Sequence, residues 1–326
     1  MASFDLLQPR RAALQVEYDL LSEKLLKLRR ESAIAAGASV QFQLEKEVEQ
    51  VEANLTKVGQ QQEDLDRLSS DGRLYQALLK LGYRKQVQTF RKFVHSYPVA
   101  AFLIYGGMEY GQRWLLNRLV VQHTRDSIAG KVVKVNLTRV ARKSDVASLW
   151  RELGGRVGLG RQGTIPEIVE RVYQWWQTQN VLLIFYEVDC LPESFLEQFL
   201  CEFWRPLVDR DLGKSESPYR LLMFLVDYDG CVGDWKIPFA ETQEVSWTSM
   251  VPVKLAKIAE FSESELESWV DVFSSDLPLG FSEEIDETVQ TILGKSDDGI
   301  PEPAMDEICR MAGLDWYENE DRWLKL

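Results

Sequence analysis

The sequence has few of the residues that bind transition metals or form covalent cross-links. Its 326 residues include two histidines and four cysteines, and no two cysteines are spaced as a Cys-x-x-Cys pair. We therefore expect no metal site, since a structural zinc site needs about four such ligands close together. The cysteines are expected to be isolated buried thiols of a cytosolic protein.

Long apolar runs are also missing. Apolar runs such as Val181–Phe185 are much shorter than the about 20 residues that a membrane-spanning helix needs. The first residues, MASFDLLQPRR, lack the apolar segment and the cleavage site of a signal peptide. These features lead us to expect a cytoplasmic protein that does not insert into membranes.

Charge is distributed unevenly along the chain. Residues 71–161 carry 17 basic and 5 acidic side chains, a balance of +12, whereas residues 162–326 carry 12 basic and 34 acidic ones, a balance of −22. The basic block could contact nucleic acid, or it could neutralise the acidic half of the same chain. We favour neutralisation, so nucleic acid is not the expected partner.

Residues 1–70 have the apolar spacing of a helical hairpin. Apolar side chains recur at alternating intervals of four and three residues on both sides of a break at Ala36–Gly37–Ala38, which predicts two antiparallel coiled-coil helices. The seam positions are Leu14, Tyr18, Leu21, Leu25, Leu28, Leu44, Val48, Val51, Leu55 and Val58. Such a thin hairpin could pack only on the following domain. We favour binding of a protein partner, or of a second copy of the chain, at these positions.

An α/β domain is expected after a hinge at Ser69–Gly72 and a helical linker over residues 71–97. Between residues 98 and 260, apolar strand patterns alternate with helical ones, which is typical of a parallel sheet with helices on both faces. The expected strands are Val99–Tyr105, Val132–Leu137, Asn180–Asp189 and Tyr219–Tyr228, with Pro252–Ile258 as a fifth candidate. Residues 261–326 are expected to form an acidic helical lid.

The turn after the first strand has the spacing of a phosphate-binding loop. Gly106 and Gly111 bracket four residues, the first of them Gly107, and a helical pattern follows, as in the GxxxxGK[ST] motif. Two glycines could also simply end a strand, but the strand and helix on either side favour a vestigial loop. Gln112 stands where the motif has lysine, and Arg113 where it has serine or threonine. The phosphate-binding cation and the magnesium ligand are therefore both missing.

The third strand lacks the acid that completes a nucleotide site. Tyr186 stands where the magnesium-binding aspartate is expected, and the nearest acids are Glu187 and Asp189. A shift of one residue turns a side chain to the opposite face of a strand, so Glu187 cannot simply replace the missing acid. The carboxyl ends of parallel strands meet at one rim, which should bring three segments together. These segments are Gly106–Arg113, Tyr186–Asp189 and Asp227–Asp229.

The sequence resembles the inactive STAND family of bacterial P-loop proteins, best known in cyanobacteria. The resemblance rests on LIYGGMEYGQRWLLNRLV, LLIFYEVDC and GIPEPAMDEICRMAG, and the N-terminal hairpin is similar to helical segments beside effector-associated and STAND-type modules. STAND proteins are signal-transducing ATPases whose nucleotide state controls oligomerisation, and the inactive branch has lost the catalytic residues. The resemblance implies a P-loop NTPase-like fold without enzyme activity. Gln112, Arg113 and Tyr186 hold the positions of the lost residues.

Three functions are compatible with these features. The leading hypothesis is a non-catalytic adaptor or regulator of a bacterial signalling or conflict system, which binds a protein partner through its hairpin and needs no cofactor. The alternative is a sensor that binds nucleotide without magnesium and without hydrolysis, with Arg113 replacing the missing cation. A slow NTPase that uses Glu187 or Asp189 is least favoured, because the loop offers no matching metal ligand.

Overall fold

The computed structural model describes residues 4–34, 38–68, 70–141, 145–210, 218–241, 247–274, 277, 281 and 284–326. The chain divides into two compact units. The first comprises residues 1–81, 267–288 and 312–314, and the second comprises residues 82–266, 289–311 and 315–326. The predicted domain boundaries after residues 70, 97 and 260 stay predictions, because compactness alone does not define an independently folding domain.

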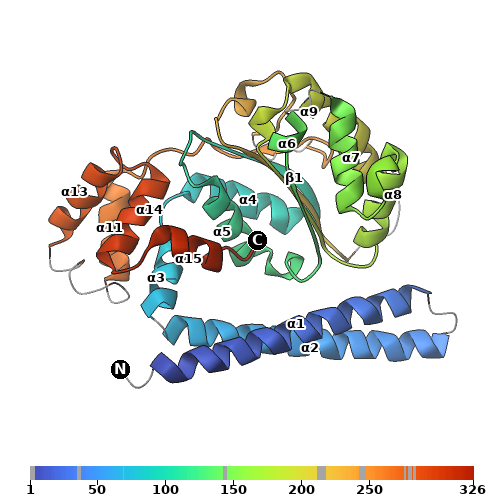
Figure 1. Ribbon diagram of the computed structural model, residues 1–326, viewed down its shortest axis with the longest axis horizontal. Helices are drawn as coiled ribbons and strands as arrows, with labels where there is room; N and C mark the ends of the chain where they lie inside the picture. The colour runs from blue at the N-terminus through green and yellow to red at the C-terminus, as the bar shows by residue number, and fades with distance from the viewer. Residues whose placement is uncertain are drawn as a thin grey trace. The chain divides into compact units, whose positions relative to one another are not determined.

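A helical hairpin forms most of the first unit. Helices α1 (Phe4–Ile34) and α2 (Ala38–Leu68) run antiparallel (Figure 1). Two polar contacts join them: Arg29 donates to Glu52 over 2.7 Å, and Gln62 donates to Gln15 over 3.2 Å. Between the helices, Leu25, Leu28, Val51 and Leu55 form a small buried cluster, with Tyr18, Leu21, Leu44 and Val48 partly buried against it. Of the predicted break, residues 36 and 37 lie outside the described residues, and Ala38 begins α2.

The predicted hinge at Ser69–Gly72 stays a prediction. Ser69 lies outside the described residues, but residues 70–72 form the first turn of helix α3 (Ser70–Leu78). Serine and aspartate favour the amino-terminal turn of a helix as well as reverse turns, so this composition begins a helix here. In the same unit, the indole of Trp269 in helix α11 (Glu263–Phe273) donates to the carbonyl of Ala77 over 2.8 Å.

The second unit contains a parallel sheet that has five strands within the described residues. The strands are β1 (Val99–Tyr105), β2 (Lys131–Asn136), β3 (Val181–Tyr186), β4 (Leu221–Asp227) and β5 (Val253–Lys254). Their order is β2-β3-β4-β1-β5. The register places Tyr105 opposite Asp227, and Tyr186 opposite Val226. The predicted α/β fold is confirmed.

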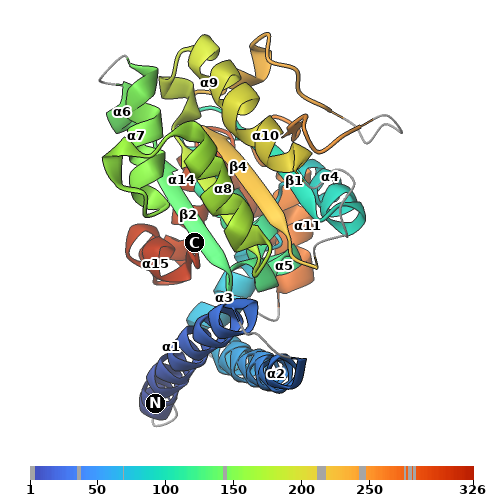
Figure 2. The ribbon, with the colours of Figure 1, turned by 90° about the vertical axis from the view of Figure 1, so that its right-hand side faces the viewer.

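Helices cover both faces of the sheet, which explains why β1 and β4 are continuous apolar runs (Figures 1 and 2). One face carries α4 (Arg84–Ser96) and α5 (Gln112–His123), and the other carries α7 (Val146–Arg156), α8 (Ile165–Trp176), α9 (Glu193–Phe199) and α10 (Arg205–Asp209). On the α4 side, the ring of Phe90 lies 4.8 Å from that of Phe102 and 5.8 Å from that of Phe224, centroid to centroid. On the opposite side, alternate residues of the strands pack against α7 to α10.

Shorter elements connect these layers. They are η1 (Arg125–Ser127), α6 (Thr138–Ala141), η2 (Gly160–Gln162), η3 (Val188–Cys190), the π-helical turn η4 (Leu200–Trp204) and η5 (Val232–Asp234). Towards the C-terminus follow α13 (Ile285–Lys295), α14 (Pro301–Met311) and α15 (Trp316–Trp323). Within the described ranges, we find no helix with the length and apolar character needed to cross a membrane.

Three predicted strands are shorter than expected, and β4 differs least, with Leu221–Asp227 in place of Tyr219–Tyr228. The β3 strand ends three residues before Asp189, because Glu187 adopts a left-handed conformation (φ 62°) and a 3-10 turn follows. The β5 strand contains two residues instead of the predicted Pro252–Ile258, and it pairs with Phe102 and Leu103 of β1. Beyond β5, the N–H groups of Leu255 and Ile258 still donate to carbonyls of β1, over 3.1 and 3.0 Å, but the regular strand pairing has ended.

Candidate functional site

The glycine loop lies between β1 and α5, as the sequence predicts, and its backbone geometry requires glycine. Gly111 precedes α5 in a left-handed conformation (φ 73°), where a β-carbon would lie 2.3 Å from the hydroxyl of Tyr83. A β-carbon on Gly106 would lie 2.9 Å from the β-carbon of Ile258, and one on Gly107 would lie 3.0 Å from the ring of Tyr110. The loop is thus closely packed by protein atoms on several sides.

The side chain of Gln112 fills the inside of this loop. It is completely buried, and its amide nitrogen lies 2.8 Å from the carbonyl oxygen of Gly107, 3.1 Å from that of Gly106 and 3.3 Å from that of Asp227. An amide NH₂ has two hydrogens, so the three carbonyls share two donors. In a working phosphate loop, a lysine at this position reaches the phosphates of the nucleotide. Here the equivalent side chain binds the loop itself.

A carboxyl group from the C-terminal region lies at the start of α5. The backbone N–H of Gly111 donates to the side chain of Glu302, and the backbone N–H of Glu302 donates to the carbonyl of Glu109 over 2.9 Å. The amino terminus of a helix is where phosphates bind in this class of loop. Glu302 therefore places an anionic group of the protein itself against the edge of the cradle.

The environment of Glu302 disfavours its charge. Burial, together with the nearby carboxylates of Glu320 and Glu109, raises its pKa to about 7, although Arg113 and the Gly111 N–H partly oppose the shift. The carboxyl group is therefore poised to change its protonation state near neutral pH.

Two tyrosines hold the loop from outside. The hydroxyl of Tyr83 donates to the carbonyl of Tyr110 over 3.1 Å, and the hydroxyl of Tyr110 donates to the carboxylate of Glu260 in a short hydrogen bond. This bond lowers the pKa of Glu260 and raises the pKa of Tyr110. Tyr83 belongs to the turn before α4, so the packing of α4 against the sheet also fixes the loop.

Arg113 points away from the loop towards α15. Its guanidinium lies 3.6 Å from Asp321 and 3.9 Å from Glu320, and its side chain is 43% exposed. Helix α15 is itself fixed on α5, because the rings of Trp114 and Trp316 lie 5.2 Å apart. Arg113 thus forms ion pairs with the C-terminal helix and does not curl back over the glycines.

The three segments expected at one rim of the sheet do lie there. Tyr186 ends β3 beside the end of β4, and the backbone N–H of Tyr228 donates to Asp189 over 2.9 Å. The carboxylate of Asp227 is fully buried, and burial raises its pKa even though it accepts backbone N–H groups. Its donors are Asp229 at 2.9 Å, Gly230 at 2.6 Å and Val232 at 2.8 Å. Asp227 therefore shapes the turn after β4.

One group of candidate metal-binding atoms occurs among the described residues. The ligand atoms of Glu187, Asp189 and Cys190 all lie within 4.8 Å of one another. Burial raises the pKa of both Glu187 and Cys190, so these groups are less readily deprotonated than usual. Asp189 already accepts the Tyr228 N–H, and three neighbours on one turn do not form a closed ligand set.

Of the ten hairpin positions predicted as partner contacts, all but Leu14 and Val58 belong to the cluster between α1 and α2. Leu25, Leu28, Val51, Leu55 and Val58 are buried, and Leu14, Tyr18, Leu21, Leu44 and Val48 are partly buried. They therefore do not form the outer surface of the hairpin. Among the described hairpin residues, the exposed large apolar side chains are Val16 (60% exposed), Leu20 (62%), Val40 (51%) and Phe42 (58%).

Sequence reasoning missed the residues that fill and hold the loop. Glu302 follows Pro301 at the start of a helix, and acids are common there, so the sequence indicates the helix start but not the group that Glu302 meets. Tyr83 and Glu260 lie far from the loop in sequence and carry no motif. Only the tertiary fold brings them to Gly111 and Tyr110.

The strand order and the glycine loop between β1 and α5 define a P-loop NTPase-like α/β protein. Within this class, residues 78–226 match the family model described as inactive STAND. The resemblance noted in the sequence is thus confirmed over these residues, which are similar to a degenerate STAND NTPase. The matched range includes the glycine loop and Tyr186.

Several solved structures are distantly similar. The Orc1 protein of Aeropyrum pernix, solved in complex with DNA, is 17% identical, with 76% of this chain and 64% of that chain covered and a TM-score of 0.38. Cdc6p from Pyrobaculum aerophilum is 12% identical, with 76% and 64% covered and a TM-score of 0.42. The chain thus spans less than two thirds of the length of these proteins, and the likeness carries no functional argument. No curated relative matches the sequence.

Proposed function

We propose that this protein is a non-catalytic STAND-like adaptor or regulator of a bacterial signalling or conflict system, which acts by protein–protein interaction through its N-terminal hairpin. The observation that carries the proposal is the buried amide of Gln112 inside the glycine loop. A loop whose Gly106 and Gly107 carbonyls are already hydrogen-bonded to its own chain can keep its shape without a nucleotide.

Several missing contacts to phosphate and magnesium together disfavour ATP hydrolysis. Each lost charged contact to a phosphate removes about 1.5–3 kcal/mol, and the lysine and the magnesium-binding hydroxyl are both absent. Tyr186 replaces the magnesium-side acid as well. Beyond these losses, a phosphate at the start of α5 would meet the carboxyl group of Glu302, which like-charge repulsion makes unfavourable.

Phosphate release by the full-length protein with magnesium and ATP tests the absence of catalysis. We expect no release above the buffer level. Turnover that is lost when Glu187 is changed to Gln, or Asp189 to Asn, would instead support the slow NTPase. Neither substitution alters the Gln112 contacts, so a loss of activity would point to the acids themselves.

The sensor that binds nucleotide without hydrolysing it makes a different prediction. In that case Arg113 must supply the cation, and Arg113→Gln should weaken ADP binding by about tenfold or more. Because Arg113 lies against Asp321 and Glu320, we expect calorimetry to give the same ADP affinity, or the same absence of binding, for the variant and the wild type.

The outer face of the hairpin is the surface that we assign to the protein partner. Val16 and Leu20 lie one helical turn apart on α1, and both are about 60% exposed. Two such side chains on one helix face could insert between the residues of a partner helix, whereas the seam residues are already used between α1 and α2.

Light scattering and cross-linking of the full-length protein test this assignment. We expect association with another protein, or with a second copy of this chain, and we expect a Val16→Ser, Leu20→Ser double variant to lose it. The matched control is Gln43→Ser with Glu47→Ser, two exposed polar positions at the same spacing on α2. Equal association of both double variants with the partner would reject the α1 face as the contact surface.

A further inference from the structure

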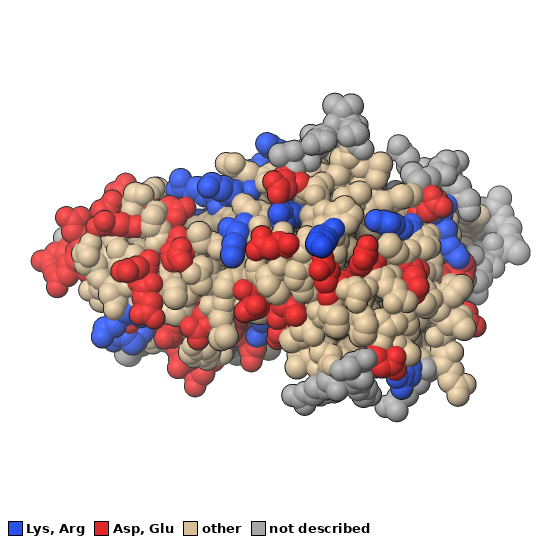
Figure 3. Space-filling view, turned by 90° about the horizontal axis from the view of Figure 1, so that it is seen from above, with Lys and Arg blue, Asp and Glu red and all other residues tan. Residues whose placement is uncertain are grey.

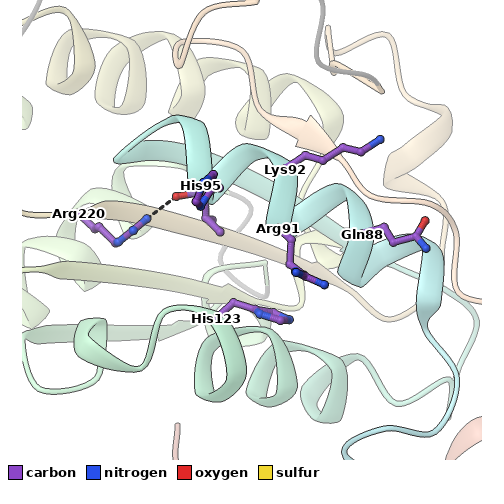
Figure 4. A pocket seen from close by; sticks show the side chains of 7 residues that line it. Gln88, Arg91, Lys92, His95, His123 and Arg220 are labelled. Carbon is purple, nitrogen blue, oxygen red and sulfur yellow. Dashed lines mark hydrogen bonds between the residues drawn. The ribbon is translucent and has the colours of Figure 1, made fainter. Parts of the chain in front are cut away.

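A pocket with an entirely non-acidic lining lies at the opposite ends of the strands from the glycine loop. Its volume is about 470 Å³, and it is formed by the last turns of α4, the end of α5 and the residue before β4 (Figure 4). The lining residues are Gln88, Arg91, Lys92, Val94, His95, His123 and Arg220. A volume of this size is typical of sites for small ligands.

The positive charge of the lining exceeds the negative charge beside it. Arg91, Lys92 and Arg220 contribute three permanent cations, and α4 contains no aspartate or glutamate in its 13 residues. The C-terminal ends of α4 and α5 each present roughly half a negative charge, about one in total. About two positive charges remain uncompensated by the lining, which is the charge that a phosphate dianion would balance.

The basic lining contains no acid, unlike most of the face drawn in Figure 3. On the face drawn in Figure 3, acidic side chains crowd one end, and elsewhere lysines and arginines lie interspersed with acids. A lone cation on a surface is usually solvated or paired with an acid. Arg91 and Lys92 on α4 and Arg220 before β4 line one concavity, and such like charges repel one another unless an anion lies between them.

Parts of the site are held in place by the fold. The guanidinium of Arg220 donates to the carbonyl of Val94 over 2.5 Å, and its backbone N–H donates to Asn180 over 2.8 Å. Figure 4 shows the side chains of Arg91 and His123 converging on the same space from α4 and α5. Pre-positioned guanidinium groups are suited to phosphate, because their planar N–H donors match its oxygens.

We propose that this pocket binds the phosphate groups of a small oligophosphate compound. The ligand is a compact di- or triphosphate rather than a nucleic acid, because the cations surround a concavity and no Phe, Trp or Tyr lines it to stack a base. The site is separate from the glycine loop, so it does not depend on the function proposed above.

Calorimetry of the full-length protein with inorganic tripolyphosphate at low salt tests the proposal. We expect saturable binding that Arg91→Gln weakens at least tenfold. The matched control is Arg84→Gln, which removes the same charge from an exposed position on the same helix that does not line the pocket, and it should change the affinity less than twofold. Glu302→Gln should leave this binding unchanged, because Glu302 belongs to the other end of the sheet.

Three results would overturn the proposal. One is the absence of binding at millimolar tripolyphosphate. Another is an equal loss of tripolyphosphate affinity in Arg84→Gln and Arg91→Gln, which would indicate that the ligand responds to the overall positive charge of α4 and not to this pocket. The third is tighter binding of a single-stranded oligonucleotide in fluorescence anisotropy, with a steep salt dependence and equal sensitivity to both variants. That pattern is typical of a surface that follows a nucleic-acid backbone.

Discussion

Replacing Glu302 by glutamine should stabilise the protein at alkaline pH and leave it unchanged in acid. The folded state raises the pKa of this carboxyl group from 4.5 to about 7. Between these pH values the folded protein holds a proton that the unfolded chain has released. The free energy of unfolding therefore decreases as pH rises through this range, and the full loss is present above pH 7. Glutamine carries no charge and avoids the loss.

The size of the effect follows from the pKa shift. A shift of one unit corresponds to about 1.4 kcal/mol, so two and a half units set an upper bound of roughly 3.4 kcal/mol. Glu302 is only partly buried, and solvent screens its neighbours Glu320 and Glu109, so we expect about 1–2 kcal/mol at pH 8. Glutamine can still accept the Gly111 N–H through its amide oxygen, so the variant keeps the contact with the loop.

Urea denaturation at pH 5 and pH 8 measures this difference. Tryptophan fluorescence is a suitable signal, because Trp114, Trp316 and Trp323 cluster where α15 meets α5. The matched control is Glu197→Gln, an exposed glutamate on α9, which should change stability by less than about 0.5 kcal/mol at either pH. A variant at position 302 that is less stable than the wild type at pH 8 would refute the reasoning. It would mean that the charged carboxylate stabilises the start of α5.

Three further substitutions test the loop and the hairpin. Gly111→Ala should lower the free energy of unfolding, measured by urea denaturation, by at least about 2 kcal/mol, because the backbone is left-handed and the β-carbon would meet Tyr83. The control Gly155→Ala lies in open space on α7 and should leave the free energy of unfolding unchanged or raise it. Gln112→Lys should destabilise by about 2 kcal/mol or more, since it buries a charge, and phosphate-release assays should detect no gain of ATPase activity. Leu55→Ala should lower the unfolding free energy of the hairpin by about 2–4 kcal/mol, measured by circular dichroism.

The order of the elements could be predicted from the sequence because local patterns encode it. The apolar runs at Val99 and Leu221 are typical of buried strands, and both form strands in the structure. Strand ends are less predictable. Glutamate at position 187 does not signal a left-handed conformation, as glycine or asparagine would, so the predicted third strand continues through it.

The glycine loop could be located from the sequence, but its contents could not. The motif spacing identifies Gly106 and Gly111, and the absence of lysine indicates that the cation is lost. A sequence pattern does not say what replaces a lost ligand group, because the replacement comes from wherever the fold brings a side chain. Strands β2 to β5 lie between Gly111 and Glu302 in the sequence, and no local periodicity links the two residues.

The natural side chains around the glycine loop bear on whether a nucleotide could switch the protein. A nucleotide can switch a protein only by binding one conformation more tightly than another. In a nucleotide switch, the phosphates provide the contacts that join the loop to the elements around it. Here the contacts are permanent: Gln112 binds the loop carbonyls, Glu302 joins the loop to α14, and Arg113 pairs with α15. A phosphate at the start of α5 would compete with the carboxyl group of Glu302 for the Gly111 N–H, whereas the Gln112 contacts are made to carbonyls, which a phosphate cannot bind. These contacts are consistent with the proposal that the sheet acts as a scaffold.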